Sequence, residues 1–264
     1  MLEMFILGAI QGIAEWIPIS SEGMIVLAKT HFFGGGRVDD MVRLALFLHA
    51  GTTAAAIIYF RKEIGTLLHD LFSFRTATEA HRRKLLFYVI AVGNSGTLGF
   101  VLIKLVERMD WIFTLYAMLF TVVVGLALCV TGILQIVRHA KTKERMESDV
   151  TVGDGVLFGF LQGIAVIPGI SRSGTTIAGL LSRGYKDEEA LRISFMLSIP
   201  IVVAGNLLLN LKMFVWDPNM MVGLLTSFIV GIITINGLLR LARKVPFGPF
   251  VLFFGVLVII SAFI

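Results

Sequence analysis

Apolar positions form long runs along this chain, and most charged positions lie in the segments between them. Six runs approach or reach the length of a membrane-crossing helix: 44–60, 85–103, 111–137, 192–211, 220–239 and 247–264. A helix needs roughly 20 predominantly apolar residues to cross the hydrocarbon core of a bilayer. The pattern therefore predicts an all-α, polytopic membrane protein with six spanning helices.

Composition agrees with this prediction and limits the possible partners. Of the 264 residues, 56% are hydrophobic and 16% are charged, whereas a soluble domain carries about 25% charged residues. The net charge of +5 is not interpreted as a nucleic-acid footprint, because basic residues of membrane proteins collect in cytoplasmic loops. The single cysteine, Cys129, excludes a disulfide framework. We expect a multi-pass protein of the plasma membrane with no nucleic-acid partner.

Two further segments, 1–29 and 152–182, are apolar at both ends but polar in the middle. The first is interrupted by Pro18, Ser20, Ser21, Glu22 and Gly23, and the second by Pro168, Gly169, Ser171, Arg172, Ser173 and Gly174. Non-helical backbone at membrane depth persists only where protein or a watery cavity satisfies its polar groups. Each segment is therefore predicted to be a re-entrant helix pair or a broken helix.

The tetrapeptide Gln-Gly-Ile-Ala occurs in both interrupted segments. A shift of 151 residues places Gln11 on Gln162, and it also superposes the following serines and glycines. Each copy precedes three of the long apolar runs, and the basic loops place the two copies on opposite membrane faces. This arrangement indicates one membrane domain built from two inverted repeats, 1–137 and 152–264. In such repeats the broken helices meet near the midplane, so we expect breaks 17–24 and 168–175 to face each other.

Glu15 and Arg172 are ionisable residues inside the interrupted segments, and Glu22 accompanies them. A charge at this depth costs several kcal/mol unless it is paired or hydrated, so a functional site is the default interpretation. The alternative is a Glu15–Arg172 ion pair that only fixes the fold. A buried pair is a poor stabiliser compared with apolar residues of similar volume, which favours the functional interpretation.

The stretch "PGISRSGTTIAGLL" has the chemistry of an anion site. A helix that restarts near Ser173 presents free backbone N–H groups, and the Arg172 guanidinium matches two phosphate oxygens. Additional hydroxyl and backbone donors are expected from Ser20, Ser171, Ser173, Gly174 and Thr176. The alternative is that these hydroxyls only cap the half-helix, which leaves the arginine unexplained.

The stretch "QGIAEWIPISSEG" supplies acceptors and nucleophiles. Gln11 and Glu15 are four residues apart and share a helical face. A carboxylate beside a phosphate is expected to hold a divalent cation, Mg²⁺ or Ca²⁺, or to act as a base. Ser20 and Ser21 are candidate nucleophiles that need such a base, and an attacking water is the alternative to the serine. His49 also lies in an apolar run and could line the cavity, although a lone histidine more often bonds to a neighbouring helix.

These two stretches resemble the signature motifs of the undecaprenyl-diphosphatase (bacitracin-resistance) family of integral membrane phosphatases. The resemblance extends through "FLHAGTTAAAIIYFRKEI" and "EEALRISFMLSIP" and so covers most of the chain. It implies that the protein dephosphorylates a polyprenyl diphosphate to the monophosphate, at a site open to the outer side, and that it forms a homodimer. It also implies catalytic roles for Glu15 and Ser21, with Gln11 where the family has Glu or Gln, and phosphate binding at Arg172.

The chain departs from the family pattern beside the nucleophile. The family usually has a histidine after the first-motif glycine, where this chain has Met24, and Glu22 replaces a small polar residue. Glu22 is therefore a candidate for the missing base; the alternative is that Glu22 points into water at the cavity mouth and Glu15 alone does the work. Because inverted repeats with broken helices are also transporter architecture, a flippase or transporter of polyprenyl phosphate lipids is the alternative function.

Overall fold

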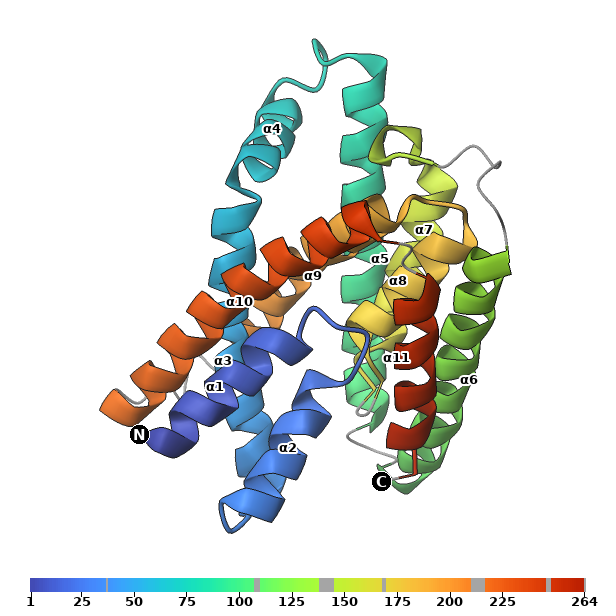
Figure 1. Ribbon diagram of the computed structural model, residues 1–264. Helices are drawn as coiled ribbons and strands as arrows, with labels where there is room; N and C mark the ends of the chain where they lie inside the picture. The colour runs from blue at the N-terminus through green and yellow to red at the C-terminus, as the bar shows by residue number, and fades with distance from the viewer. Residues whose placement is uncertain are drawn as a thin grey trace.

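The computed structural model describes residues 1–36, 38–106, 110–137, 145–167, 170–209, 217–245 and 248–263, and this part of the chain is helical throughout (Figure 1). The first half contains α1 (Leu2–Ala14), α2 (Ser21–Phe32), α3 (Val38–Tyr59), α4 (Arg61–Phe72), α5 (Glu79–Val106) and α6 (Asp110–Val137). The second half contains α7 (Val152–Ile164), α8 (Arg172–Ser182), α9 (Asp187–Leu209), α10 (Pro218–Lys244) and α11 (Gly248–Ser261). The all-α prediction is confirmed for the described residues.

Among the described residues, four helices are long and apolar enough to cross a membrane. These stretches, Asp40–Tyr59, Glu79–Leu105, Asp187–Leu207 and Pro218–Lys244, match the predicted spans 44–60, 85–103, 192–211 and 220–239. The predicted span 111–137 falls in α6, many of whose side chains lie outside the described residues. The predicted span 247–264 contains α11, an apolar helix of 14 residues. The two helices α6 and α11 pack along each other (Figure 1), and their role as spans stays a prediction.

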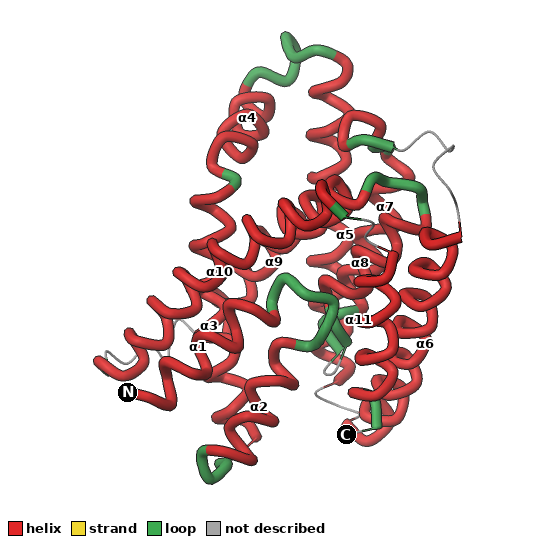
Figure 2. Tube along the Cα trace, viewed as in Figure 1, coloured by secondary structure: helices red, strands yellow, loops and turns green. Residues whose placement is uncertain are grey.

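Each interrupted segment forms two short helices joined by a loop. Segment 1–29 forms α1 and α2, and segment 152–182 forms α7 and α8; Pro168 and Gly169 lie outside the described residues. The restart of each second helix is marked by a serine N-cap, since Ser20 Oγ accepts from Gly23 N and Ser171 Oγ accepts from Gly174 N. Figure 2 shows the α1–α2 loop in the middle of the molecule, where it adjoins the start of α8.

Glycines let the two halves interlock at equivalent positions. Gly8 and Gly12 bring α1 against α10, and Gly159 and Gly163, 151 residues further on, bring α7 against α5. A Cβ at Gly8 would lie 2.4 Å from the Gly223 carbonyl oxygen, so only glycine permits this approach. The first helix of each half is thus packed on a long helix of the other half. This exchange fits the predicted repeat, whose opposed orientation in the membrane stays a prediction.

A buried carboxylate holds the start of α7. Asp154 is fully buried and accepts hydrogen bonds from Arg145 at 2.6 Å, Arg183 at 3.0 Å and Tyr185 at 2.9 Å, while it forms a capping box with Thr151. Burial and the bond to this carboxylate raise the pKa of the Tyr185 phenol, which keeps the hydroxyl a donor. The cluster therefore ties α7 to the end of α8.

Close packing at Gly159 predicts a loss of stability on enlargement. A Cβ there would lie 2.6 Å from the Ala91 carbonyl oxygen, so Gly159→Val is expected to destabilise the protein by about 1–3 kcal/mol. Gly237, in the interior of α10, is the matched control, because a Cβ added there would have no atom within 4 Å. Gly237→Ala should be neutral or stabilising by up to about 1 kcal/mol, because alanine is the better helix former. Unfolding in detergent measures both; equal stability of the two variants would contradict the α5–α7 contact.

Candidate active site

Two helix N-termini meet at one cavity of about 270 Å³. The start of α2 contributes Ser20, Ser21 and Glu22, and the start of α8 contributes Ser171, Arg172 and Ser173. The first-turn N–H groups of a helix have no intrahelical partners, and they carry the positive end of the helix dipole. Two such ends converge here from the two halves of the chain. The two helix ends thus present positive dipole ends to an anion, in a cavity whose wall also carries the Glu15 and Glu22 carboxylates.

The two breaks touch directly, as the repeat predicts. Ser171 Oγ donates to the Ile19 carbonyl at 3.0 Å, and Ser173 Oγ donates to the Ile17 carbonyl at 2.7 Å. These bonds satisfy two carbonyls in the α1–α2 loop that no helix can pair. The expectation that breaks 17–24 and 168–175 face each other is confirmed for their described residues.

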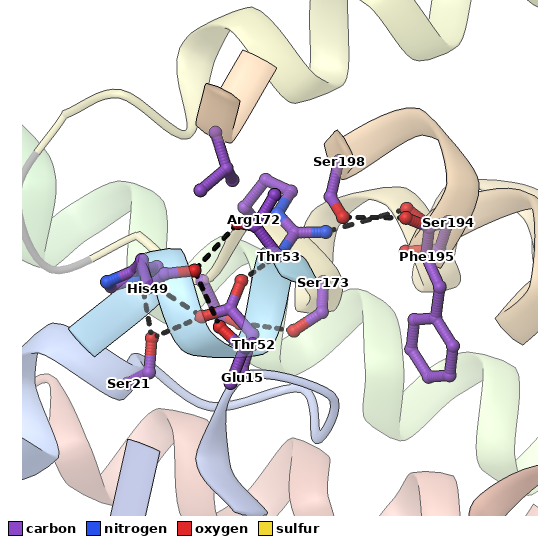
Figure 3. Close-up of polar contacts among 12 residues, drawn as sticks. Glu15, Ser21, His49, Thr52, Thr53, Arg172, Ser173, Ser194, Phe195 and Ser198 are labelled. Carbon is purple, nitrogen blue, oxygen red and sulfur yellow. Dashed lines mark hydrogen bonds and ion pairs between the residues drawn. The ribbon is translucent and has the colours of Figure 1, made fainter. Parts of the chain in front are cut away.

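Glu15 and Arg172 form an ion pair across the halves. Glu15 follows α1 and Arg172 begins α8, and the guanidinium Nη2 contacts the Glu15 carboxylate at Oε1 (Figure 3). Both side chains are largely shielded from solvent, at 5% and 15% exposure. Arg172 also approaches the Ser194 carbonyl at 3.5 Å. The guanidinium is thus held at the cavity wall by two acceptors, one of which belongs to the other half of the chain.

The other carboxylate oxygen of Glu15 is surrounded by three further groups. Its Oε2 accepts from Gln11 Nε2 at 2.9 Å and from Ser21 Oγ at 3.0 Å, and it lies 3.0 Å from His49 Nε2. The Ser21 hydroxyl also lies 3.3 Å from His49 Nε2, as Figure 3 shows. Ser21, Glu15 and His49 therefore form a compact triangle of nucleophile, carboxylate and imidazole.

The remaining predicted anion donors are placed less directly. Ser20 caps α2, and Ser171 caps α8, which is the role that the alternative interpretation assigned to such hydroxyls. Thr176 bonds to Ser194 Oγ at 2.6 Å. Ser20, Ser171 and Ser173 line the cavity, whereas Gly174 and Thr176 are packed behind it. Their phosphate-binding role stays a prediction; in this structure their hydroxyls mainly hold α8 in place.

The structure brings His49, not Glu22, into contact with the Ser21 hydroxyl. Glu22 lines the cavity, but the bonds of Ser21 go to Glu15 and His49. His49 is 8% exposed and comes from α3, a helix remote in sequence from both motifs. The sequence predicted only that His49 could line the cavity, which the structure confirms; it assigned no chemical role, because a lone histidine in an apolar run carries no spacing signal. Only the packing of α3 against α1 and α2 reveals it.

A cation at Gln11 and Glu15 finds few oxygen ligands in this arrangement. Gln11 Oε1 is buried without a hydrogen-bond partner, which leaves one oxygen available. Both Glu15 oxygens, however, face donors, including the Arg172 guanidinium. Mg²⁺ and Ca²⁺ require about six or more oxygen ligands, and no group of three acidic, histidine or cysteine side chains suited to a metal occurs in the described ranges. The residues present do not fit a protein-held divalent cation.

The fold and the cavity define a polytopic helical membrane protein with a buried serine, carboxylate, histidine and arginine beside an apolar chamber. The chain matches the family described as bacitracin resistance protein BacA over residues 4–260, and it belongs to that family.

Curated relatives are similar over nearly their whole length. An undecaprenyl-diphosphatase of Haloarcula marismortui is 40% identical, with 97% of this chain and 94% of the relative covered. One of Methanococcoides burtonii is 38% identical over 99% and 98%. One of Methanothrix thermoacetophila is 34% identical over 97% and 94%.

Removal of Arg172 tests the energetics of the buried pair. Arg172→Ala removes the arginine partner of Glu15 and is expected to lower the free energy of unfolding by about 3 kcal/mol. This value is the lower end of the range for a broken buried ion pair, because His49 still contacts the Glu15 carboxylate. The double variant Glu15→Ala/Arg172→Ala should regain part of that loss. A double-mutant cycle of unfolding free energies in detergent measures the coupling. Additive losses would show that the two side chains do not interact.

Proposed function

We propose that this protein removes the terminal phosphate from undecaprenyl diphosphate, or a similar polyprenyl diphosphate, and so returns the monophosphate carrier to cell-wall or glycan synthesis. The observation that carries the proposal is the Ser21 hydroxyl, bonded to Glu15 and beside Arg172 at the wall of a cavity. Relatives that carry the name undecaprenyl-diphosphatase support the same activity.

The cavity has the two-sided chemistry of a prenyl diphosphate. Its polar end is formed by the serines, Glu15 and Arg172 described above. Its other end lies between α5 and α9 and is lined by Gly99, Phe100, Ile103, Ile201 and Val202. A diphosphate head group fits the first end, because the helix termini and the guanidinium bind anions. An isoprenoid chain fits the second end, because binding there removes the apolar surface of the isoprenoid from water.

The chain's own residues bind the head group, attack phosphorus and take up the proton in the first chemical step. Arg172 exchanges the Glu15 carboxylate for two oxygens of the terminal phosphate, since its planar fork matches either partner. Glu15 Oε2, already 3.0 Å from Ser21 Oγ, accepts the hydroxyl proton as Oγ attacks phosphorus. The bond from phosphorus to the bridging oxygen breaks, and prenyl monophosphate leaves. The helix termini stabilise the charge on the transferred phosphoryl group.

The divalent cation expected from the sequence is proposed to bind the substrate and not the protein. Because both oxygens of Glu15 are engaged by donors, we infer that Mg²⁺ or Ca²⁺ is carried by the diphosphate and enters as part of the substrate. A cation carried in this way would need no dedicated protein cage, which is how Mg²⁺ is commonly bound, and would supply neutralisation of phosphate charge.

We also propose the membrane arrangement. The helices α6 and α11 complete six spans, and the pairs α1–α2 and α7–α8 are re-entrant from opposite faces, which makes residues 1–137 and 152–264 inverted repeats of one domain. The cavity opens to the outer side of the plasma membrane, and two chains form a homodimer. The exchanged glycine contacts support the repeat. The transporter alternative is not favoured, because the relatives are named as phosphatases.

Loss of the nucleophile or of the planar cation should abolish turnover. Ser21→Ala is expected to lower kcat at least about 100-fold, and Arg172→Lys about 100-fold, since lysine keeps the charge but loses the two-pronged contact. Ser182→Ala, at an exposed hydroxyl near the end of α8, is the matched control and should leave kcat unchanged. Phosphate release from undecaprenyl diphosphate by the purified protein measures all three. Full activity of Arg172→Lys would mean that the ion pair only fixes the fold.

The cation proposal is tested through Gln11, whose side-chain oxygen has no hydrogen-bond partner. Gln11→Ala is compared with wild type for the Mg²⁺ concentration that restores half of the activity after chelation. With the cation on the substrate, this midpoint should change less than about twofold even if kcat falls, because the protein supplies few of its ligands. A tenfold rise in the midpoint would place the cation on Gln11.

A further inference from the structure

His49 is held rigidly between the backbone of its own helix and the reacting groups. Its Nδ1 lies 2.6 Å from the Ala45 carbonyl oxygen, one turn earlier in α3. The hydroxyls of Thr52 and Thr53 donate to the His49 carbonyl at 3.1 and 2.7 Å. The ring therefore has a single orientation, with Nε2 directed at Glu15 and Ser21 (Figure 3).

The partners of the ring define its protonation. A backbone carbonyl is only an acceptor, so Nδ1 carries a hydrogen. The ionised Glu15 carboxylate, 3.0 Å from Nε2, is also only an acceptor, so Nε2 carries a hydrogen as well. His49 is thus an imidazolium in the resting site. It has no lone pair with which to take a proton from Ser21, and the base in the attack is Glu15.

An imidazolium beside Ser21 cannot accept a proton, but it can donate one to the serine oxygen. When Ser21 carries the phosphoryl group, water must displace a serine alkoxide, which is a poor leaving group. In the first step the leaving group is a prenyl phosphate, which departs readily without a proton. The two steps therefore differ in their need for an acid, and the Nε2–H of His49 lies 3.3 Å from the oxygen that needs it.

We propose that His49 is the general acid that releases Ser21 from a phosphoserine intermediate; this inference rests on the proposed function. Water forms a bond to phosphorus while the phosphorus–Oγ bond breaks, and Oγ takes the proton from His49 Nε2. The products are the Ser21 hydroxyl, dihydrogen phosphate and neutral His49. Glu15, which gained the Ser21 proton in the first step, then passes it 3.0 Å to His49 and restores the resting site.

The proton therefore travels once around the triangle, from Ser21 to Glu15, to His49 and back to Ser21. Its three sides measure 3.0, 3.0 and 3.3 Å, each within reach of a proton transfer after small adjustments. No outside acid is needed, and both protons of the attacking water leave with the phosphate. The triangle is assembled from α1, α2 and α3, so it belongs to the first half of the chain.

The experiment follows the two products separately with His49→Gln. The glutamine amide retains an N–H donor toward Glu15 but cannot give up a proton. With terminally ³²P-labelled undecaprenyl diphosphate and rapid quenching, this variant should release one equivalent of prenyl monophosphate per protein in a burst. Phosphate release should then be at least about 100-fold slower than in wild type. Acid-stable label should accumulate on Ser21, and Ser21→Ala/His49→Gln should carry none.

Two controls separate the possible failures. Thr66→Val removes an exposed hydroxyl from α4, away from the cavity, and should show neither burst nor label. If His49→Gln aggregates, His49→Ala is used instead, and added imidazole should speed the loss of label from Ser21. Equal slowing of both products without label, or unchanged turnover, would overturn the role of His49. Absence of prenyl monophosphate from wild type would instead overturn the proposed function.

Discussion

The buried contact between Glu15 and Arg172 is the interaction on which the site depends. Each residue lies beside the break of its own half: Glu15 directly follows α1, and Arg172 is the first residue of α8. An isolated carboxylate or guanidinium at this depth is costly. Together the two charges satisfy one another and join the halves at the one place where both backbones are irregular. The serines of the second break extend this junction by bonding to carbonyls of the first.

Glycine packing is the condition that lets this contact form. The short helices α1 and α7 reach the centre because glycines bring them against α10 and α5. Dispersion and close approach drive association of helices in lipid, where apolar burial offers little. Each half therefore supplies the surface that holds the other half's broken helix. The packing of these helices, not a local sequence motif, sets the distances between Ser21, Glu15 and His49.

Sequence patterns predicted much of the fold and part of the site. Apolar runs located α3, α5, α9 and α10, and proline, glycine and serine located both breaks, because these signals are local in the chain. The ion pair was also foreseen, since an unpaired charge in an apolar segment demands a partner. His49 was not, because its role arises from where α3 packs, which no spacing encodes. The role of Glu22 stays a prediction: it lines the cavity, but adjacency to Ser21 along a helix does not by itself bring two side chains together.

In the resting site Arg172, Ser21, Glu15 and His49 are bonded to one another, which limits the ligands that can displace these contacts. Arg172 is engaged by Glu15, and Ser21 is engaged by Glu15 and His49. A ligand enters productively only if it offers Arg172 a better partner than the carboxylate. In the proposed function a terminal phosphate does so, because it carries more negative charge and faces two helix termini. The same exchange would release Glu15 Oε1 from the guanidinium as Oε2 takes the proton of Ser21. Binding of the correct head group and readiness of the base are thus one event, whereas a neutral lipid leaves the pair intact and the serine unused.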